Sequence, residues 1–171
     1  MNANVEIKAR VADPEELARR ARDLSGGDPE VLRQEDVFFE VPRGRLKLRT
    51  IAGGRSELIG YSRSDREGPT TSSYVVTPIP DPAGVREALS STLGEAGVVS
   101  KTRYLSLVGR TRIHLDEVEG LGWYMELEVV MKHGEDASAG EGEARRLMTA
   151  LGVFEDDLVD RAYVDLLKEN R

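Results

Sequence analysis

The sequence contains no cysteine, which excludes a disulfide framework, a thiolate metal site and a cysteine nucleophile. It also contains no long apolar run. No stretch approaches the roughly 20 residues that a membrane-spanning helix needs, and residues 1–10 lack the basic-then-apolar layout of a signal peptide. These absences predict a soluble protein with no membrane partner, and we expect it to be cytoplasmic.

Positive charge is scarce. Lys and Arg together number 24 against 31 Asp and Glu, so the formal net charge is −7. This balance argues against broad binding of nucleic acid, and any site for an anion must therefore be local. The sequence also lacks a Walker-type phosphate loop, a dinucleotide fingerprint and the nucleophile elbow of acyl hydrolases.

Alternation of polar and apolar residues predicts that strands dominate the fold. Strands are expected over residues 4–11, 31–41, 45–51, 56–63, 73–78, 98–109, 111–118 and 123–131. Asp-Pro pairs at Asp13 and Asp81 predict two helix starts, and helical spacing predicts further helices over 141–151 and 156–168. Because no repeat or linker interrupts the pattern, we expect one α+β domain over residues 1–171.

The polar faces of these strands concentrate like charges, strand by strand. The groups are Asn4, Glu6 and Lys8; Arg45, Lys47 and Arg49; Lys101 and Arg103; Arg110, Arg112, His114 and Asp116; and Glu126 and Glu128. Each group alone is compatible with an ordinary solvated face. Neighbouring like charges repel, however, unless a ligand or an opposite charge lies between them. In a closed barrel these faces would converge, with Lys and Arg binding a polyanion and carboxylates binding Mg²⁺ or Mn²⁺.

Five short motifs occur in an order that resembles the CYTH family, which is named for class IV adenylyl cyclase and thiamine triphosphatase. The motifs run from Asn4 to Lys8, Gln34 to Phe39, Arg45 to Arg49, Val99 to Arg103 and His114 to Glu128. The resemblance extends to about Leu167 and so covers nearly the whole chain. It implies a closed antiparallel β-barrel, a tunnel of about eight strands with helices packed outside.

Carried over residue by residue, the resemblance implies a site of metal-binding acids and phosphate-binding bases. The acids that would hold Mg²⁺ or Mn²⁺ are Glu6, Asp116, Glu126 and Glu128. The bases that would hold phosphate are Lys8, Lys47, Arg49, Arg63, Lys101 and Arg103, with Lys8 and Arg63 also the catalytic candidates. One position departs from the family: Asn4 stands where its first motif begins with Glu. An amide can ligate a metal but brings no negative charge, so the number of metal ions is left open.

The resemblance implies a metal-dependent enzyme acting on a small-molecule triphosphate such as ATP. The segment from His114 to Glu128 is most similar to the class IV adenylyl cyclase branch, whose lyase reaction yields cyclic AMP and pyrophosphate. The alternatives are an inorganic, nucleoside or thiamine triphosphatase, and a non-catalytic module that binds nucleotide or polyphosphate. A homodimer is expected from the family. His114 is interpreted either as a tunnel residue or as a hydrogen-bonded structural histidine, and Tyr163 is expected to pack rather than to reach substrate.

Overall fold

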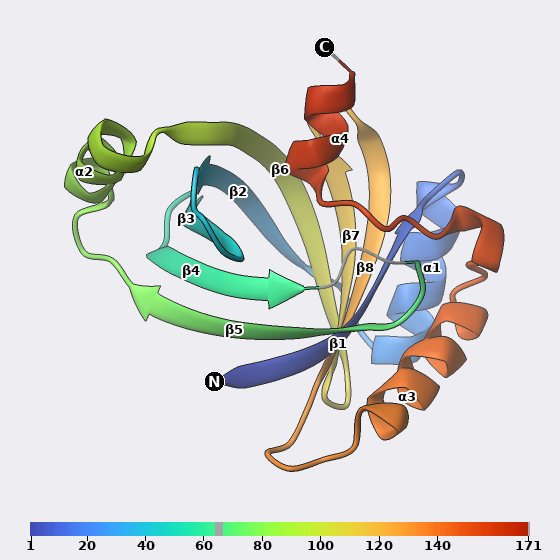
Figure 1. The fold of residues 1–171 in the computed structure, drawn as a ribbon. Helices are drawn as coiled ribbons and strands as arrows, with labels where there is room; N and C mark the ends of the chain where they lie inside the picture. The colour runs from blue at the N-terminus through green and yellow to red at the C-terminus, as the bar shows by residue number, and fades with distance from the viewer. Residues whose placement is uncertain (64–66, 171) are drawn as a thin grey trace.

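The computed structural model describes residues 1–63 and 67–170. Within them the strands form a closed antiparallel barrel in the order β1-β5-β4-β3-β2-β6-β7-β8 (Figure 1). The predicted α+β class, with a closed barrel and helices outside, is confirmed. In chain order the elements are β1 (Asn2–Arg10), α1 (Pro14–Ser25), β2 (Glu30–Phe39), β3 (Arg45–Ile51), β4 (Ser56–Arg63), β5 (Thr70–Pro78), α2 (Pro82–Leu93), β6 (Glu95–Val108), β7 (Thr111–Val118), β8 (Gly122–Val130), α3 (Ala137–Ala150), η1 (Glu155–Asp157, a 3₁₀ turn) and α4 (Tyr163–Glu169).

The barrel wall is apolar on its outer side and polar on its inner side. On the paired strands β1 and β8, Ile7 lies opposite Leu127, and both belong to a fully buried cluster with Leu147 of α3. One residue earlier on β1, Glu6 lies opposite Glu128, and both line the interior. Each large aliphatic side chain buried outside the wall contributes about 1.5–3 kcal/mol to stability. The main apolar core therefore lies between wall and helices, which leaves the interior free to be charged.

Helices α1 and α3 cover the same side of the barrel, with α3 against β1 and β8 and α1 against β6 and β7 (Figure 1). The approach of α3 is close at Gly140, where a Cβ atom would lie 2.5 Å from Met131 Sδ and 2.8 Å from Val5 Cγ2. Helix α2 packs on β2 and β3, and α4 packs on β6. No helix of the described segments is long and apolar enough to span a membrane.

The helix starts predicted from Asp-Pro pairs are confirmed. Asp13 accepts a hydrogen bond from the Glu16 backbone N–H, and Asp81 accepts one from the Gly84 N–H. Helix α3 begins earlier than the predicted residue 141, because Asp136 accepts a hydrogen bond from the Ser138 N–H and caps the preceding turn. The apolar spacing alone did not reveal that cap.

The helix predicted over residues 156–168 is wrong in its first half. The chain is extended after η1, and Leu158 forms a β-bridge with Ala9 while the Val159 N–H donates to the Lys8 carbonyl at 2.9 Å. Backbone pairing with the end of β1 thus replaces the predicted helical turns, and α4 starts only at Tyr163. This extended segment brings the first residues of α4 to the barrel interior.

Candidate active site

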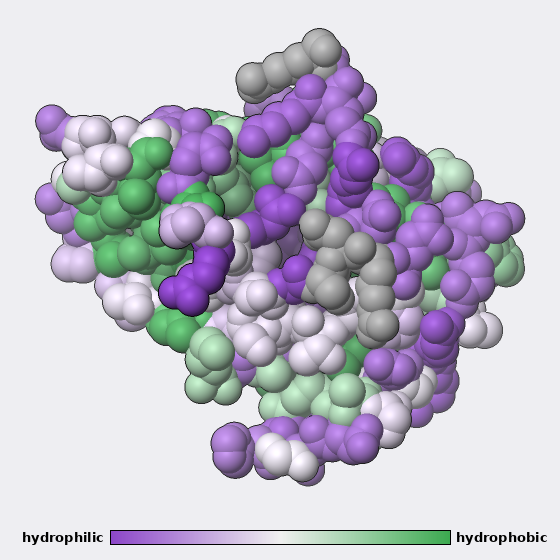
Figure 2. Space-filling model, in the orientation of Figure 1, coloured by the Kyte–Doolittle hydropathy of each residue, from purple (hydrophilic) through white to green (hydrophobic). Residues whose placement is uncertain are grey.

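The barrel encloses a cavity of about 340 Å³, lined by inward-facing residues of all eight strands and by the start of α4. Figure 2 shows hydrophilic side chains gathered below α4 on one face of the molecule. The cavity lining carries more positive than negative groups, although the whole chain has a net charge of −7. Among the described residues its charged groups are Lys8, Lys47, Arg49, Arg55, Arg63, Lys101, Arg103 and Arg112, with Glu6, Asp36, Glu57, Glu126 and Glu128.

Asp36 of β2 organises the basic side of the cavity. Arg49 donates two hydrogen bonds to its carboxylate, at 2.7 and 2.8 Å, and Lys47 donates one at 3.0 Å. Lys101 Nζ lies 3.8 Å away. Burial alone would raise the pKa of Asp36, but Arg49, Lys47 and Lys101 outweigh that effect and hold the pKa well below its usual value. A single carboxylate thus faces three cations, whose charge is only partly offset.

Asp116 of β7 positions Arg103 of β6. Arg103 donates to both carboxylate oxygens, at 2.8 and 2.7 Å, and the Tyr163 hydroxyl donates to the same carboxylate at 2.9 Å. Arg103 Nη2 also lies 3.6 Å from Glu126 Oε2. Asp116 is fully buried behind these partners and does not contribute to the cavity lining. Its oxygens therefore orient a phosphate-binding candidate instead of facing the interior.

Burial lowers the pKa of Lys8 and of Lys101 toward neutral pH. Lys8 Nζ lies 3.6 Å from Glu126 and 4.0 Å from the centre of the Tyr163 ring. Burial lowers its pKa to about 8 despite that carboxylate. Burial and the neighbouring Arg103 lower the pKa of Lys101 to about 7. A bound anion would favour the charged form of both lysines, so both are suited to hold one.

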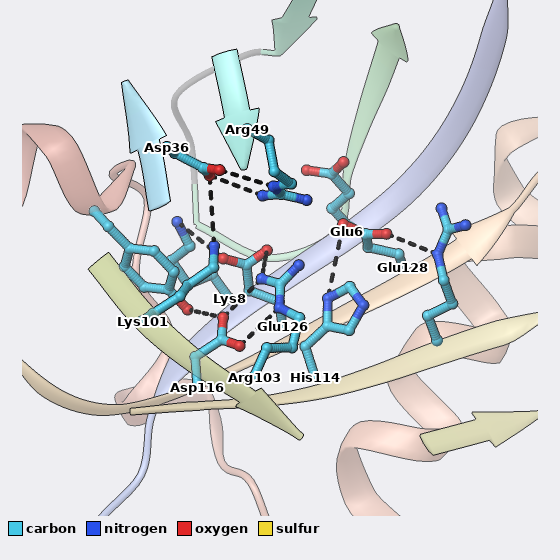
Figure 3. Close-up of polar contacts among 12 residues, drawn as sticks. Glu6, Lys8, Asp36, Arg49, Lys101, Arg103, His114, Asp116, Glu126 and Glu128 are labelled. Carbon is cyan, nitrogen blue, oxygen red and sulfur yellow. Dashed lines mark hydrogen bonds and ion pairs between the residues drawn. The ribbon is translucent and has the colours of Figure 1, made fainter. Parts of the chain in front are cut away.

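The opposite side of the cavity is acidic. Burial, then Glu128 and Glu126, raise the pKa of Glu6 to about 7, and this opposes the effect of nearby cations. One ligand atom each from His114, Glu126 and Glu128 lie within 4.8 Å of one another (Figure 3). A divalent cation would relieve the repulsion between these carboxylates, and oxygen ligands of this kind suit Mg²⁺ and Mn²⁺. The residues present therefore fit the metal that the fold family implies.

Three buried polar atoms of the cavity lack a hydrogen-bond partner among the described residues: Gln34 Oε1, Arg63 Nε and His114 Nδ1. Arg63 Nη1 lies 3.7 Å from Glu6, too far for a hydrogen bond. Burial and Arg103 lower the pKa of His114 to about 4, so its imidazole is neutral near pH 7. Unpaired buried polar groups are costly, and a bound ligand or an ordered water molecule would supply the partners that these atoms lack.

The structure brings nearly all the predicted site residues together. Glu6, Lys8, Lys47, Arg49, Arg63, Lys101, Arg103, Glu126 and Glu128 line the one cavity. Asp116 lies on the inward side of β7 but beneath Arg103 and Tyr163, so it does not line the cavity. Arg110, grouped with the inward residues of β7 by its spacing, lies before that strand and instead donates to Glu135 and Glu143 outside the barrel.

Three residues of the site, Asp36, Arg112 and Tyr163, were not among the predicted metal-binding or phosphate-binding residues. Asp36 lies on the inward side of β2 with Gln34 and Phe38, so the alternation within its motif was a usable signal. Arg112 was noted for its strand face, and its Nε donates to Glu128 at 3.0 Å. Tyr163 was expected to pack; it does pack, but its ring and hydroxyl also contact charged residues of the site.

Known structures share this fold. The PH1012 protein of Pyrococcus horikoshii is 25% identical with a TM-score of 0.85, over 96% of this chain and 99% of that one. A candidate adenylate cyclase of Vibrio parahaemolyticus is 21% identical with a TM-score of 0.80, over 96% and 97%. A Hippeastrum protein, described as a candidate adenylyl cyclase with a dominant triphosphatase activity, is 18% identical with a TM-score of 0.69, over 98% and 96%.

No curated protein sequence matches the chain significantly. Residues 2–163 match the family described as the CYTH domain, which is almost the full length of the sequence and includes every strand of the barrel. The resemblance that the five motifs carried is thereby confirmed: the chain belongs to the CYTH domain family.

Proposed function

We propose that the protein is a divalent-metal-dependent enzyme that acts on a triphosphate inside the barrel, with conversion of ATP to cyclic AMP and pyrophosphate as the first candidate reaction. The observation that carries this proposal is the cavity lining. Its cations outnumber its acids in a chain with a net charge of −7, and three of its acids, Glu6, Glu126 and Glu128, gather on one side. A metal–triphosphate complex has the matching charge distribution.

On the acidic side, Glu6, Glu126 and Glu128 would hold Mg²⁺ or Mn²⁺. When bound, the ion neutralises phosphate oxygens and makes the phosphorus more susceptible to attack. Glu6 and Glu128 face each other across neighbouring strands, so both can reach one ion. Asn4, on the same face of β1, can add an amide oxygen. We assign Asp116 to the positioning of Arg103, because both of its oxygens are already engaged.

On the basic side, Lys47, Arg49, Lys101 and Arg103 would bind the phosphates that do not react. Lys8 and Arg63 lie beside the carboxylates, at 3.6 Å from Glu126 and 3.7 Å from Glu6. We assign these two residues to the reacting phosphoryl group, where they stabilise charge that develops during transfer. Phosphoryl chemistry needs little beyond such positioning and charge.

A nucleotide substrate is favoured by apolar residues in the same lining. Ile59 and Val76 are directly paired on β4 and β5, and Leu32, Ile51 and Leu105 also line the cavity. Phosphate makes no use of such contacts, whereas a nucleoside buries apolar surface against them. With the ribose 3′-hydroxyl as nucleophile the product is cyclic AMP, and with water the enzyme is a triphosphatase.

A triphosphatase is the second candidate, because CYTH family members act as triphosphatases or cyclases and the same cavity serves both reactions. A binding module without catalysis is the third. A single domain over residues 1–171, a homodimer, a cytoplasmic location and the absence of a nucleic-acid partner stay predictions of the sequence.

The test is to incubate the protein with Mg²⁺ or Mn²⁺ and ATP, inorganic triphosphate or thiamine triphosphate, and to resolve the products by chromatography. Cyclic AMP identifies a cyclase and orthophosphate a triphosphatase, while binding without products identifies the module. Excess chelator should abolish turnover, and Glu128→Gln should remove most of it. Glu117→Gln is the matched control, because Glu117 is an exposed residue on β7 outside the lining. Full turnover in chelator would refute the metal-dependent enzyme.

A further inference from the structure

The binding of phosphate does not account for the position of His114 in the site. Its side chain is 5% exposed, and Nδ1 is buried with no hydrogen-bond partner in the described segments. On the paired strands β7 and β8, it lies directly opposite Glu126. Figure 3 shows the ring turned toward the carboxylates rather than toward the basic side of the cavity.

The distances around Nδ1 suit a shared ion better than a direct hydrogen bond. Nδ1 lies 3.8 Å from Glu128 Oε1, beyond hydrogen-bond range. Two ligand atoms that are each about 2.1 Å from one ion lie up to about 4.2 Å apart. The 3.8 Å separation therefore fits two ligands of a common ion. Glu126 supplies a third ligand atom to the same group.

The oxygen ligands nearby are weaker than a purely acidic site would offer. Asn4, which replaces an acid of the family's first motif, brings no charge, and its Oδ1 accepts a hydrogen bond from the Tyr74 hydroxyl at 3.3 Å. Arg112 donates to Glu128 and offsets part of that carboxylate's charge. Both features reduce the negative charge that the oxygen ligands offer to a cation, so an additional ligand atom would matter more at this site.

We infer that His114 is a nitrogen ligand of the metal site and makes that site select a first-row transition-metal ion, such as Mn²⁺, over Mg²⁺. The inference rests on the metal site of the proposed function. Imidazole nitrogen binds transition-metal ions well and Mg²⁺ poorly, so one nitrogen among the ligands shifts the preference without a change in cavity size. His114 is thus a residue that determines metal specificity.

Pulsed electron paramagnetic resonance of bound Mn²⁺ tests the ligand directly. The chain contains only two histidines, so labelling with ¹⁵N-histidine leaves two candidates for nitrogen coupling to the ion. The second, His133, is exposed after β8, and His133→Asn is the matched control. We expect histidine nitrogen coupling in the wild-type protein and in His133→Asn, and its loss in His114→Asn. Bound Mn²⁺ without histidine coupling in the wild-type protein would overturn the inference, whether or not any variant folds.

Isothermal titration calorimetry with Mn²⁺ and with Mg²⁺ measures the metal specificity. The ratio of Mn²⁺ to Mg²⁺ affinity should fall at least about 10-fold in His114→Asp, which replaces nitrogen by carboxylate oxygen, because even residues that only orient metal ligands change affinity by such factors. An unchanged ratio would overturn the inference.

Turnover of the triphosphate panel on the same samples separates this inference from the proposed function. Turnover with equal Mn²⁺ and Mg²⁺ affinities and no histidine coupling would remove the inference and leave the function. Histidine coupling without turnover of any triphosphate would remove the function and leave the ligand. If the wild-type protein binds no Mn²⁺, the inference is wrong, and if it binds neither Mn²⁺ nor Mg²⁺, the proposed function is wrong as well.

Discussion

Arg103 and Asp116 form a bidentate ion pair, with N–O distances of 2.8 and 2.7 Å, and their side chains are only 4% and 0% exposed. Removing one partner of such a pair leaves an uncompensated buried charge, which costs about 3–5 kcal/mol. The pair fixes the position of Arg103 in the charged interior, because Asp116 lies beneath Arg103 on the neighbouring strand and Arg103 lines the cavity.

Asp116→Asn should therefore lower the free energy of unfolding by about 3–5 kcal/mol, measured by urea denaturation. Affinity for triphosphate should fall as well, because Arg103 loses its fixed orientation, whereas Mn²⁺ affinity should stay nearly unchanged. Tyr163→Phe is the control, since it removes one hydrogen bond to Asp116 and leaves the ion pair, at a cost of about 0.5–1.5 kcal/mol. A loss of Mn²⁺ affinity as large as that of Glu128→Gln would instead make Asp116 a metal ligand.

The basic side of the cavity should bind the substrate phosphates. Alanine at Lys47 or Arg49 should weaken triphosphate binding by about 1.5–3 kcal/mol, the range for hydrogen bonds to a charged group. Isothermal titration calorimetry with inorganic triphosphate measures the change. Arg110→Ala provides the comparison, because Arg110 pairs with Glu135 and Glu143 outside the cavity and should leave the affinity as it is. Unchanged affinity in both Lys47→Ala and Arg49→Ala would show that these two residues do not bind the substrate phosphates.

The affinity for triphosphate should depend on pH through Lys101, whose pKa is lowered to about 7 by burial and by Arg103. Above pH 7 this lysine is mostly neutral in the free protein, and it must take up a proton to pair with phosphate. Affinity should therefore fall as the pH rises from 7 toward the ordinary lysine value of 10.5.

Calorimetry in buffers of different ionisation enthalpy would detect this proton uptake at pH 8–9. Lys101→Arg is the control, because a guanidinium stays charged over the whole range. The same uptake in Lys101→Arg as in the wild-type protein would assign the proton to another group.

The alternation of side chains along the strands explains why many residues of this site could be predicted from the sequence. The alternation through Lys47 and Arg49, and through Glu126 and Glu128, has period two, and a strand turns every second side chain to one side. Closure of the barrel then brings these faces together, so residues distant in sequence could be assigned to one interior without coordinates.

Sequence periodicity fails to predict the structure where neighbouring side chains cover an inward residue, or where backbone pairing overrides helical spacing. The alternation along β7 correctly predicts that Asp116 points to the inside of the barrel. Arg103 and Tyr163 cover its side chain there, so it does not reach the cavity. Leu158 and Val159 have helical spacing, but they pair with the end of β1. Such outcomes depend on tertiary contacts that neither period nor composition encodes.

Asn4 provides a further test of the metal site, because it is the position at which the chain departs from the family's first motif. Its side chain faces the cavity on the same side of β1 as Glu6, and the residue is 3% exposed. Asn4→Glu keeps an acceptor for the Tyr74 hydroxyl and adds a negative charge. In the free protein that charge should lower thermal stability, because burial and neighbouring carboxylates already raise the pKa of Glu6 to about 7.

A bound cation reverses the effect of the added charge. Asn4→Glu should therefore bind Mn²⁺ more tightly than the wild-type protein, since the number of charged ligands sets affinity for such ions, and its melting temperature should rise more when Mn²⁺ is added. Calorimetry and thermal melts with and without Mn²⁺ measure both quantities, and Asn4→Gln controls for side-chain length without charge. Turnover is a poor readout here, because an additional ion can accelerate the reaction or misplace the attacking group. Equal or weaker Mn²⁺ affinity in Asn4→Glu would show that the ion is held elsewhere, away from the first residue of the motif.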